Sequence, residues 1–242
     1  MISLRRAAAR HHDPRHRRKV WWTFDPLDPF DRTDRLAVGF GTLENLDENR
    51  LPPHADVPRY ARDEAEIVTY VREGTVAYED SMGYTGVIHA GEFQRMMAAL
   101  GARHHEANAS RAHWAHVFQI RLRRSAAELE PGREQKRFSA AERRGGLCVV
   151  ASPDARRGSL RLGQDARVYS ALLQPGQHVV HELAPGRAVW LHVVQGEVTL
   201  GDLALTTGDG AGITTERAVS LTTREDSEIL LFDVAERQAR GP

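Results

Sequence analysis

The sequence predicts an all-β protein made of two tandem antiparallel β-barrels of the jelly-roll type, joined by short helices. The chain holds many short runs rich in β-branched and aromatic residues, most of them bounded by Gly, Pro, Asp or Asn. Short strands at such regular spacing are typical of barrels and sandwiches. Helical patterns are sparse, and the strand pattern of the first half recurs weakly in the second. A half-length repeat of this kind indicates two similar domains.

The expected strands fall into two groups along the chain. Each is short enough for a barrel strand and ends close to a residue that favours a turn. In order, the runs lie at 37–46, 66–71, 74–80 and 116–122 in the first half, and at 147–152, 167–173, 188–194, 196–201, 218–223 and 228–234 in the second.

The repeat is clearest in two hairpins. "EIVTYVREGTV" (66–76) aligns with "AVWLHVVQGEV" (188–198) at an offset of 122 residues, which places Gly74 on Gly196. A glycine between two β runs is a strong signal for a hairpin turn. We therefore expect equivalent hairpins in the two barrels.

Between the repeats, two segments carry the signature of short capped helices. "SAAELEP" (125–131) and "SAAERRG" (139–145) each begin at a serine with a glutamate nearby, as in a capping box. The predicted organisation is an N-terminal barrel over residues 1–124, a connector over 125–150 and a C-terminal barrel over 151–242.

Composition restricts the class of protein. The formal net charge is zero, so overall charge does not favour nucleic acid or a membrane as partner. No apolar run is long enough to span a bilayer, residues 1–20 lack the apolar core of a secretory signal, and Cys148 is the single cysteine. We expect a cytoplasmic protein. Residues 1–20 are strongly basic, which fits either a solvated segment or a grip on an acidic partner.

Several motifs together resemble the pirin family of the cupin superfamily, almost from end to end. They include "WWTF" (21–24), "EIVTYVREGTVAYEDSMG" (66–83), "RHHEANAS" (103–110), "FQIRL" (118–122) and "ASPDARRGSLRLGQDARVY" (151–169). The resemblance implies a bicupin fold with a metal site, usually iron or another divalent ion, in the N-terminal barrel only. Some bacterial members look like quercetin 2,3-dioxygenases, and eukaryotic pirins act as transcription cofactors.

The chain departs from the family at the metal site that the resemblance implies. The first family motif is His-x-His-x3-Glu; with Glu66 at its last position, Tyr60 and Arg62 stand where the two histidines belong. The second motif places His104 and Glu106 on the other two ligand positions. A guanidinium stays protonated in proteins, so Arg62 disfavours a dication beside it.

We therefore expect no metal cofactor, and an ion pair between Arg62 and Glu106 in its place. The alternatives are that Arg62 turns to solvent and that His104 is a hydrogen-bonded barrel histidine without a catalytic task. If a metal does bind, His104 and Glu106 hold it, with Tyr60 as a third ligand. Arg121, if it points inward, makes the barrel interior more basic.

Three functions remain in competition. The first is a binding module that holds a small aromatic or anionic ligand with Tyr60, Arg62, Glu66, His104 and Glu106 and has little dioxygenase activity. The second is a quercetinase-like dioxygenase that uses a divalent metal such as iron. The third is a cofactor-free enzyme with Tyr60, His104 and Glu106 as catalytic residues. No membrane or nucleic-acid partner is expected; a protein partner and the oligomeric state stay open.

Overall fold

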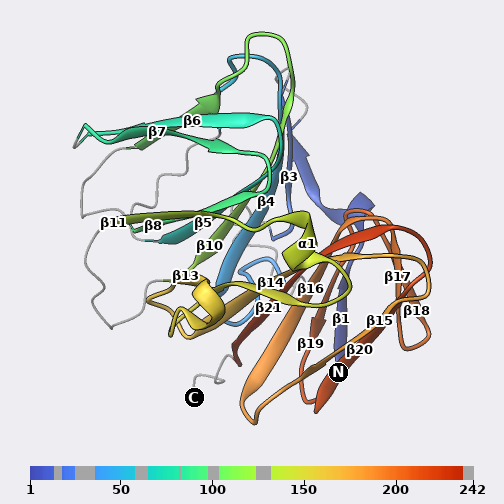
Figure 1. The fold of residues 1–242 in the computed structure, drawn as a ribbon. Coiled ribbons are helices and arrows are strands. Elements are labelled where there is room, and N and C mark those ends of the chain that lie inside the picture. The colour runs from blue at the N-terminus through green and yellow to red at the C-terminus, as the bar shows by residue number, and fades with distance from the viewer. Residues whose placement is uncertain are drawn as a thin grey trace.

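The computed structural model describes residues 1–13, 18–24, 36–57, 65–81, 83–97, 104–123 and 132–236. It confirms the predicted fold class: the chain is almost entirely β, in two cupin-like halves that lie side by side (Figure 1). Each half combines one seven-stranded sheet with a smaller sheet. The sheets do not close into continuous barrels, so each half resembles a sandwich with an interior between its two sheets.

The N-terminal half contains two antiparallel sheets. Its large sheet has the order β11-β8-β5-β10-β4-β3-β2, and its small sheet has the order β7-β6-β9. The strands are β2 (His11–Asp13), β3 (Lys19–Trp22), β4 (Leu43–Leu51), β5 (Glu66–Glu73), β6 (Thr75–Asp80), β7 (Thr85–His89), β8 (Glu92–Met97), β9 (His104–Asn108), β10 (Ala115–Leu122) and β11 (Gly132–Arg137).

The C-terminal half repeats this plan, with the first strand of the chain added to it. Its large sheet has the order β1-β19-β16-β21-β14-β12-β13, and its small sheet has the order β15-β20-β17-β18. The strands are β1 (Ile2–Arg5), β12 (Cys148–Ser152), β13 (Leu160–Arg161), β14 (Ala166–Leu173), β15 (His178–Glu182), β16 (Arg187–Gln195), β17 (Glu197–Leu200), β18 (Leu203–Thr206), β19 (Gly210–Ile213), β20 (Ala218–Thr223) and β21 (Ser227–Ala235).

The two repeated hairpins occur where the sequence predicts them. Gly74 joins β5 to β6 with φ +79°, and Gly196 joins β16 to β17 with φ +92°. A side chain at either position would collide with its surroundings: a Cβ on Gly74 would lie 2.8 Å from the Trp114 carbonyl oxygen, and one on Gly196 would lie 2.6 Å from that of Asp226. Both turns therefore require glycine for conformation and for space.

One predicted strand is displaced and one predicted helix is confirmed. The run at 37–46 becomes a turn followed by β4, because Gly39 and Gly41 adopt positive φ of +94° and +57°. In the connector, α1 (Ala140–Arg143) begins with the expected capping box, in which Ser139 and Glu142 exchange hydrogen bonds. The segment 125–131 lies outside the described residues. Besides α1, the helical elements of the described residues are two 3-10 turns at Ala7–Ala9 and Arg156–Gly158.

The largest apolar core lies between the two seven-stranded sheets. It combines Phe118 and Tyr70 of the N-terminal half with Trp190 and Phe232 of the C-terminal half. The Tyr70 and Phe93 rings stack with centroids 4.2 Å apart. Because this core takes one face of each large sheet, the opposite faces are left to line the interiors of the two halves.

The basic N-terminal segment connects the two halves. β1 pairs with β19 in the C-terminal half and β2 pairs with β3 in the N-terminal half, and Figure 1 shows the blue β1 beside the red and orange strands. Arg6 Nη1 lies 2.8 Å from Asp209 Oδ2, and Arg10 Nη1 lies 2.8 Å from Glu48 Oε2. These two arginines thus grip acidic groups of their own chain. No helix in the described ranges has the length and apolar character required to cross a bilayer.

Candidate functional site

A row of polar side chains crosses the large sheet of the N-terminal half. The strand register places Asp47 opposite Gln119, Gln119 opposite Thr69, Thr69 opposite Gln94, and Gln94 opposite Gln135. Directly opposed residues of neighbouring strands have their side chains on the same face of the sheet. The row therefore spans β4, β10, β5, β8 and β11 on one face.

This row faces the interior of the N-terminal half. Its sequence neighbours Phe118 and Tyr70 belong to the core between the two large sheets, and successive side chains of a strand point to opposite faces. The contact across the interior agrees: Gln119 Nε2 donates to Glu106 Oε2 at 2.8 Å, and Glu106 lies on β9 in the small sheet. The N-terminal half thus has a polar interior.

Glu106 is a buried carboxyl group in this interior, and only one of its two oxygens is paired within the described residues. Its residue is 3% exposed, and its second oxygen, Oε1, has no hydrogen-bond partner among the described residues. Burial raises the pKa of the Glu106 carboxyl, although the charge of Arg133 and the Gln119 hydrogen bond act in the opposite direction. An open, buried carboxyl oxygen is able to accept or donate a hydrogen bond to a ligand.

Two arginines bring positive charge into this interior, and one of them, Arg133, pairs with Asp80 at 3.3 Å. Arg133 on β11 lies over the Tyr78 ring at 4.5 Å and donates to Gln94 Oε1 at 3.0 Å. Arg121 on β10 is 7% exposed and lies two residues after Gln119, on the same face of the strand. The structure thus places Arg121 inward, which is the arrangement that favours an anionic ligand.

Three of the predicted site residues, Glu66, His104 and Glu106, lie within the described part of the chain. His104 is half-buried at the start of β9, two residues before Glu106, so both residues belong to the same face of that strand. His105 alternates to the other face, where its Nε2 lies 2.9 Å from Asp56 Oδ1. Tyr60 and Arg62 lie outside the described residues, so their roles stay predictions.

Glu66 is held in place by the rest of the protein. Arg95 Nε donates to Glu66 Oε1 at 2.8 Å, and the backbone nitrogens of Gly163 and Gln164 donate to its carboxylate at 3.0 Å and 3.2 Å. Gly163 and Gln164 follow β13 of the C-terminal half, so Glu66 connects the two halves. A role for Glu66 in ligand binding stays a prediction.

Within the part of the chain that the structure describes, the donor set for a divalent metal is incomplete. Of the four positions that the family resemblance assigns to ligands, only His104 and Glu106 carry the imidazole and carboxylate that such ions prefer. Among the residues that the structure describes, no three or more His, Cys, Asp or Glu residues gather as a metal cluster. Burial raises the pKa of the Glu106 carboxyl, and a metal ligand must be deprotonated.

The interior of the C-terminal half is apolar instead. β16 contributes Val189, Leu191 and Val193 to a core that lies entirely within this half. The three histidines that the sequence leaves scattered there do not converge. His178 contacts Thr222, His181 contacts Asp233, and His192 lies on the other face of β16 against Phe118.

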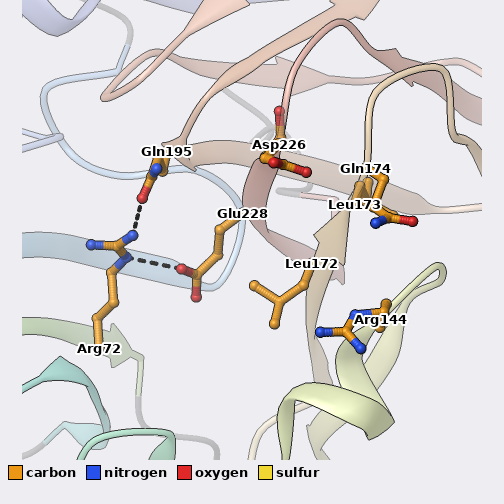
Figure 2. A pocket seen from close by; sticks show the side chains of 9 residues that line it. Arg72, Arg144, Leu172, Leu173, Gln174, Gln195, Asp226 and Glu228 are labelled. Carbon is orange, nitrogen blue, oxygen red and sulfur yellow. Dashed lines mark hydrogen bonds and ion pairs between the residues drawn. The ribbon is translucent and has the colours of Figure 1, made fainter.

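A pocket of about 380 Å³ opens where the two halves meet (Figure 2). Figure 2 shows Arg72 turned towards Glu228 and Gln195; Arg72 Nε donates to Glu228 Oε2 at 2.9 Å. Tyr70 and Arg143 also donate hydrogen bonds to Glu228. Burial and the charge of Glu228 raise the pKa of Tyr70, so its hydroxyl remains a donor. The ion pair between Arg72 and Glu228 in this pocket thus joins the two halves.

Sequence reasoning identified Glu106 and His104 but missed most of the polar interior. Asp47, Gln94, Gln119 and Arg133 were not singled out, although "FQIRL" (118–122) alternates apolar and polar residues. That alternation is a signal for a strand with two different faces. Without the register it does not reveal that the polar faces of several strands meet.

Two family models match the chain in succession. The model described as "Pirin" matches residues 6–122, and the model described as "Quercetinase C-terminal cupin domain" matches residues 149–234. Together they cover both halves of the structure.

Individual relatives match along nearly the whole chain. The protein named "Quercetin 2,3-dioxygenase" from Escherichia coli (strain K12) is 38% identical over 234 residues, which cover 97% of this chain and 99% of the relative. The "Pirin-like protein" of Caulobacter vibrioides is 31% identical and covers 84% of this chain and 87% of its own. The crystal structure of YhhW from Escherichia coli superposes with a TM-score of 0.88 at 37% identity, covering 99% of this chain and 100% of that one. A second YhhW structure, in complex with nickel(II), also gives 0.88, at 36% identity, covering 98% of this chain and 100% of that one.

Proposed function

Because the chain belongs to the pirin family, we propose that it is a bicupin whose N-terminal half binds a small aromatic or anionic ligand. The proposal includes little or no metal-dependent dioxygenase activity. The observations that support it are the polar interior around Glu106, whose Oε1 lacks a partner among the described residues, and the sequence departure at Tyr60 and Arg62 from the histidines of the family motif.

Each described group has a defined task in this proposal. Arg121 and Arg133 supply positive charge that attracts an anionic group of the ligand. Gln119 fixes one oxygen of Glu106 by its hydrogen bond of 2.8 Å, which leaves Oε1 to contact the ligand. A hydroxyl of an aromatic ligand satisfies Oε1 whether the carboxyl is ionised or protonated, because a hydroxyl both donates and accepts.

The second candidate is a metal-dependent dioxygenase. It is favoured by the name of the Escherichia coli relative, quercetin 2,3-dioxygenase, and by the nickel(II) complex of YhhW. His104 and Glu106 would then hold the ion, with Tyr60 as a third ligand, and the ion would supply Lewis-acid and dioxygen chemistry. A cofactor-free enzyme that uses Tyr60, His104 and Glu106 for proton transfer is the remaining alternative.

Metal content and dioxygen uptake distinguish these candidates. We expect the purified protein to hold far less than one equivalent of metal, and to consume little dioxygen with quercetin after addition of iron, copper, nickel, manganese or cobalt. Loss of even indirect metal partners costs roughly tenfold to a hundredfold in affinity. Dioxygen uptake that rises in proportion to bound metal contradicts the proposal and supports the second candidate.

A restored variant provides the matched control. The double substitution Tyr60→His and Arg62→His recreates the histidine pair of the family motif beside His104 and Glu106. We expect this variant to bind metal in the same assay in which the natural protein does not. Quercetin consumption without metal, abolished by His104→Ala, is the result that favours the cofactor-free enzyme.

A further inference from the structure

Asn49 has a fully buried amide that makes no hydrogen bond to any residue that the structure describes. Its side chain lies on β4 and its residue is 0% exposed. Neither Oδ1 nor Nδ2 has a hydrogen-bond partner within the described part of the chain. Buried polar groups in folded proteins are nearly always hydrogen-bonded, because an unpaired donor or acceptor loses its contacts with water and gains nothing. An amide with both atoms open therefore points to a partner from outside the chain.

The position of Asn49 connects it with the proposed site. Asn49 stands opposite Val117 in the register, and Val117 stands opposite Val71. Asn49 is also two residues after Asp47, so it lies on the same interior face, one row from Gln119. Val71 and Val117 belong to the apolar cluster of the N-terminal half. Asn49 thus lies at the border between the polar row and this cluster.

A second asparagine in the same half shows what a structural role requires. Asn108 on β9 is 2% exposed. Its Nδ2 donates to the carbonyl oxygens of Leu51, Pro52 and His113 at 2.9–3.1 Å, and its Oδ1 accepts from the Ser110 backbone nitrogen at 2.9 Å. Every polar atom of this amide is used, whereas none of the polar atoms of Asn49 is.

We propose that Asn49 contacts the ligand and determines which ligands are accepted, an inference that rests on the proposed function. A primary amide presents a donor and an acceptor side by side. Its complement is a ligand in which a hydrogen-bond donor adjoins an acceptor, such as a hydroxyl next to a ring carbonyl. The neighbouring valines contact the apolar body of that ligand.

The first test compares the stability of two variants without ligand. Asn49→Leu removes an amide that the protein itself does not use, so its Tm should equal or exceed that of the natural protein. Asn108→Leu removes four hydrogen bonds and leaves their partners buried, so its Tm should fall by at least roughly 4 °C. A fall for Asn49→Leu as large as that for Asn108→Leu assigns Asn49 a structural role and overturns the inference.

The second test measures ligand selectivity by calorimetry, with quercetin and its 3-O-methyl ether as probes. The ether keeps the ring carbonyl and the 5-hydroxyl beside it but lacks the 3-hydroxyl, so the comparison tests the 3-hydroxyl and the carbonyl as the pair that the amide contacts. The natural protein should prefer quercetin by roughly threefold to tenfold, the value of one neutral hydrogen bond, and Asn49→Leu should abolish this preference.

The outcomes separate the two proposals. If the natural protein binds quercetin and Asn49→Leu keeps the full preference, the assignment of Asn49 is wrong while the proposed function stands. If the natural protein binds neither probe, the proposed function fails for this ligand class, and the assignment of Asn49 fails with it. His178→Leu, at an exposed position of β15 in the C-terminal half, is the control and should leave the preference unchanged.

Discussion

The two halves share a backbone plan but have opposite interiors. Thr69 on β5 and Leu191 on β16 occupy equivalent positions in the repeat, each on the interior face of its large sheet. Thr69 belongs to a polar row with Gln119 and Gln94, whereas Leu191 belongs to an apolar core. The C-terminal half is therefore stabilised by its own interior. The N-terminal half has a smaller apolar cluster of its own, which includes Val71 and Val117, and shares the larger core between the halves.

The largest expected effect comes from exchanging the two equivalent residues. Leu191→Thr places a hydroxyl without a partner in an apolar core and removes methyl groups, which should cost roughly 3–5 kcal/mol of unfolding free energy. Thr69→Leu adds apolar volume to a polar interior and should cost less than about 1.5 kcal/mol. Urea denaturation of both variants at pH 7 measures the difference.

Equal costs for the two substitutions would contradict the comparison. They would mean that the interior of the N-terminal half is packed as tightly as that of the C-terminal half. Leu231→Thr is a suitable control, since Leu231 on β21 belongs to the same apolar core as Leu191 and should respond in the same way.

Two buried glutamates of the N-terminal half, Glu48 on β4 and Glu106 on β9, should respond oppositely when glutamine removes their charge. Burial tends to raise the pKa of Glu48, but the hydrogen bond from His116 and the charge of Arg10 outweigh it and lower that pKa from 4.5 to about 2. A lowered folded-state pKa stabilises the protein above pH 4.5, and this stabilisation is lost as the pH falls towards 2. Glu48→Gln should therefore cost roughly 3 kcal/mol at pH 7, with a smaller cost at pH 3.5.

Glu106 in the polar interior has the opposite sign. Its folded-state pKa is raised above 4.5, chiefly by burial, so the folded protein loses stability as the pH rises above 4.5. Glu106→Gln should therefore raise the free energy of unfolding at pH 7, with no gain below pH 4.5. A loss of stability for Glu106→Gln at pH 7 would instead indicate that Glu106 is ionised and paired, as in the ion pair with Arg62 that the sequence predicts.

The strands predicted from the sequence are those with an apolar face. β10, β14, β16, β20 and β21 all occur within one or two residues of their expected runs, because their apolar side chains reach a core. The Gly74 and Gly196 hairpins were predictable for a different reason: only glycine tolerates both the positive φ and the close contacts of these turns.

The missed strands belong mostly to the edges and to the polar interior. β11, "GREQKR", falls within the predicted connector, yet it pairs with β8 along its whole length. It has no apolar periodicity because Arg133 and Gln135 face the polar interior and the rest is exposed. The feature that forms the candidate site thus also removed the signal by which its strand would be found.

The smallest expected effect concerns His192, on the face of β16 that meets the N-terminal half. Both ring nitrogens of this fully buried side chain lack a hydrogen-bond partner in the described ranges. Burial, with a contribution from the charge of Arg10, lowers the pKa of His192 from 6.5 to about 3. The unfolded chain therefore binds a proton below pH 6.5 that the folded protein does not, so the stability falls as the pH drops from 6.5 towards 3.

Replacing His192 should remove this sensitivity to acid. His192→Leu should raise the free energy of unfolding by about 1 kcal/mol at pH 7, because two unpaired polar atoms are replaced by apolar ones that suit the neighbouring Phe118 ring. This gain in the free energy of unfolding should increase as the pH falls from 6.5 to 4, because the natural protein becomes less stable. His178→Leu, at an exposed position, should change neither value. A loss of stability for His192→Leu at pH 7 would mean that the imidazole is hydrogen-bonded in the folded protein, and that the face between the halves holds a polar partner for it.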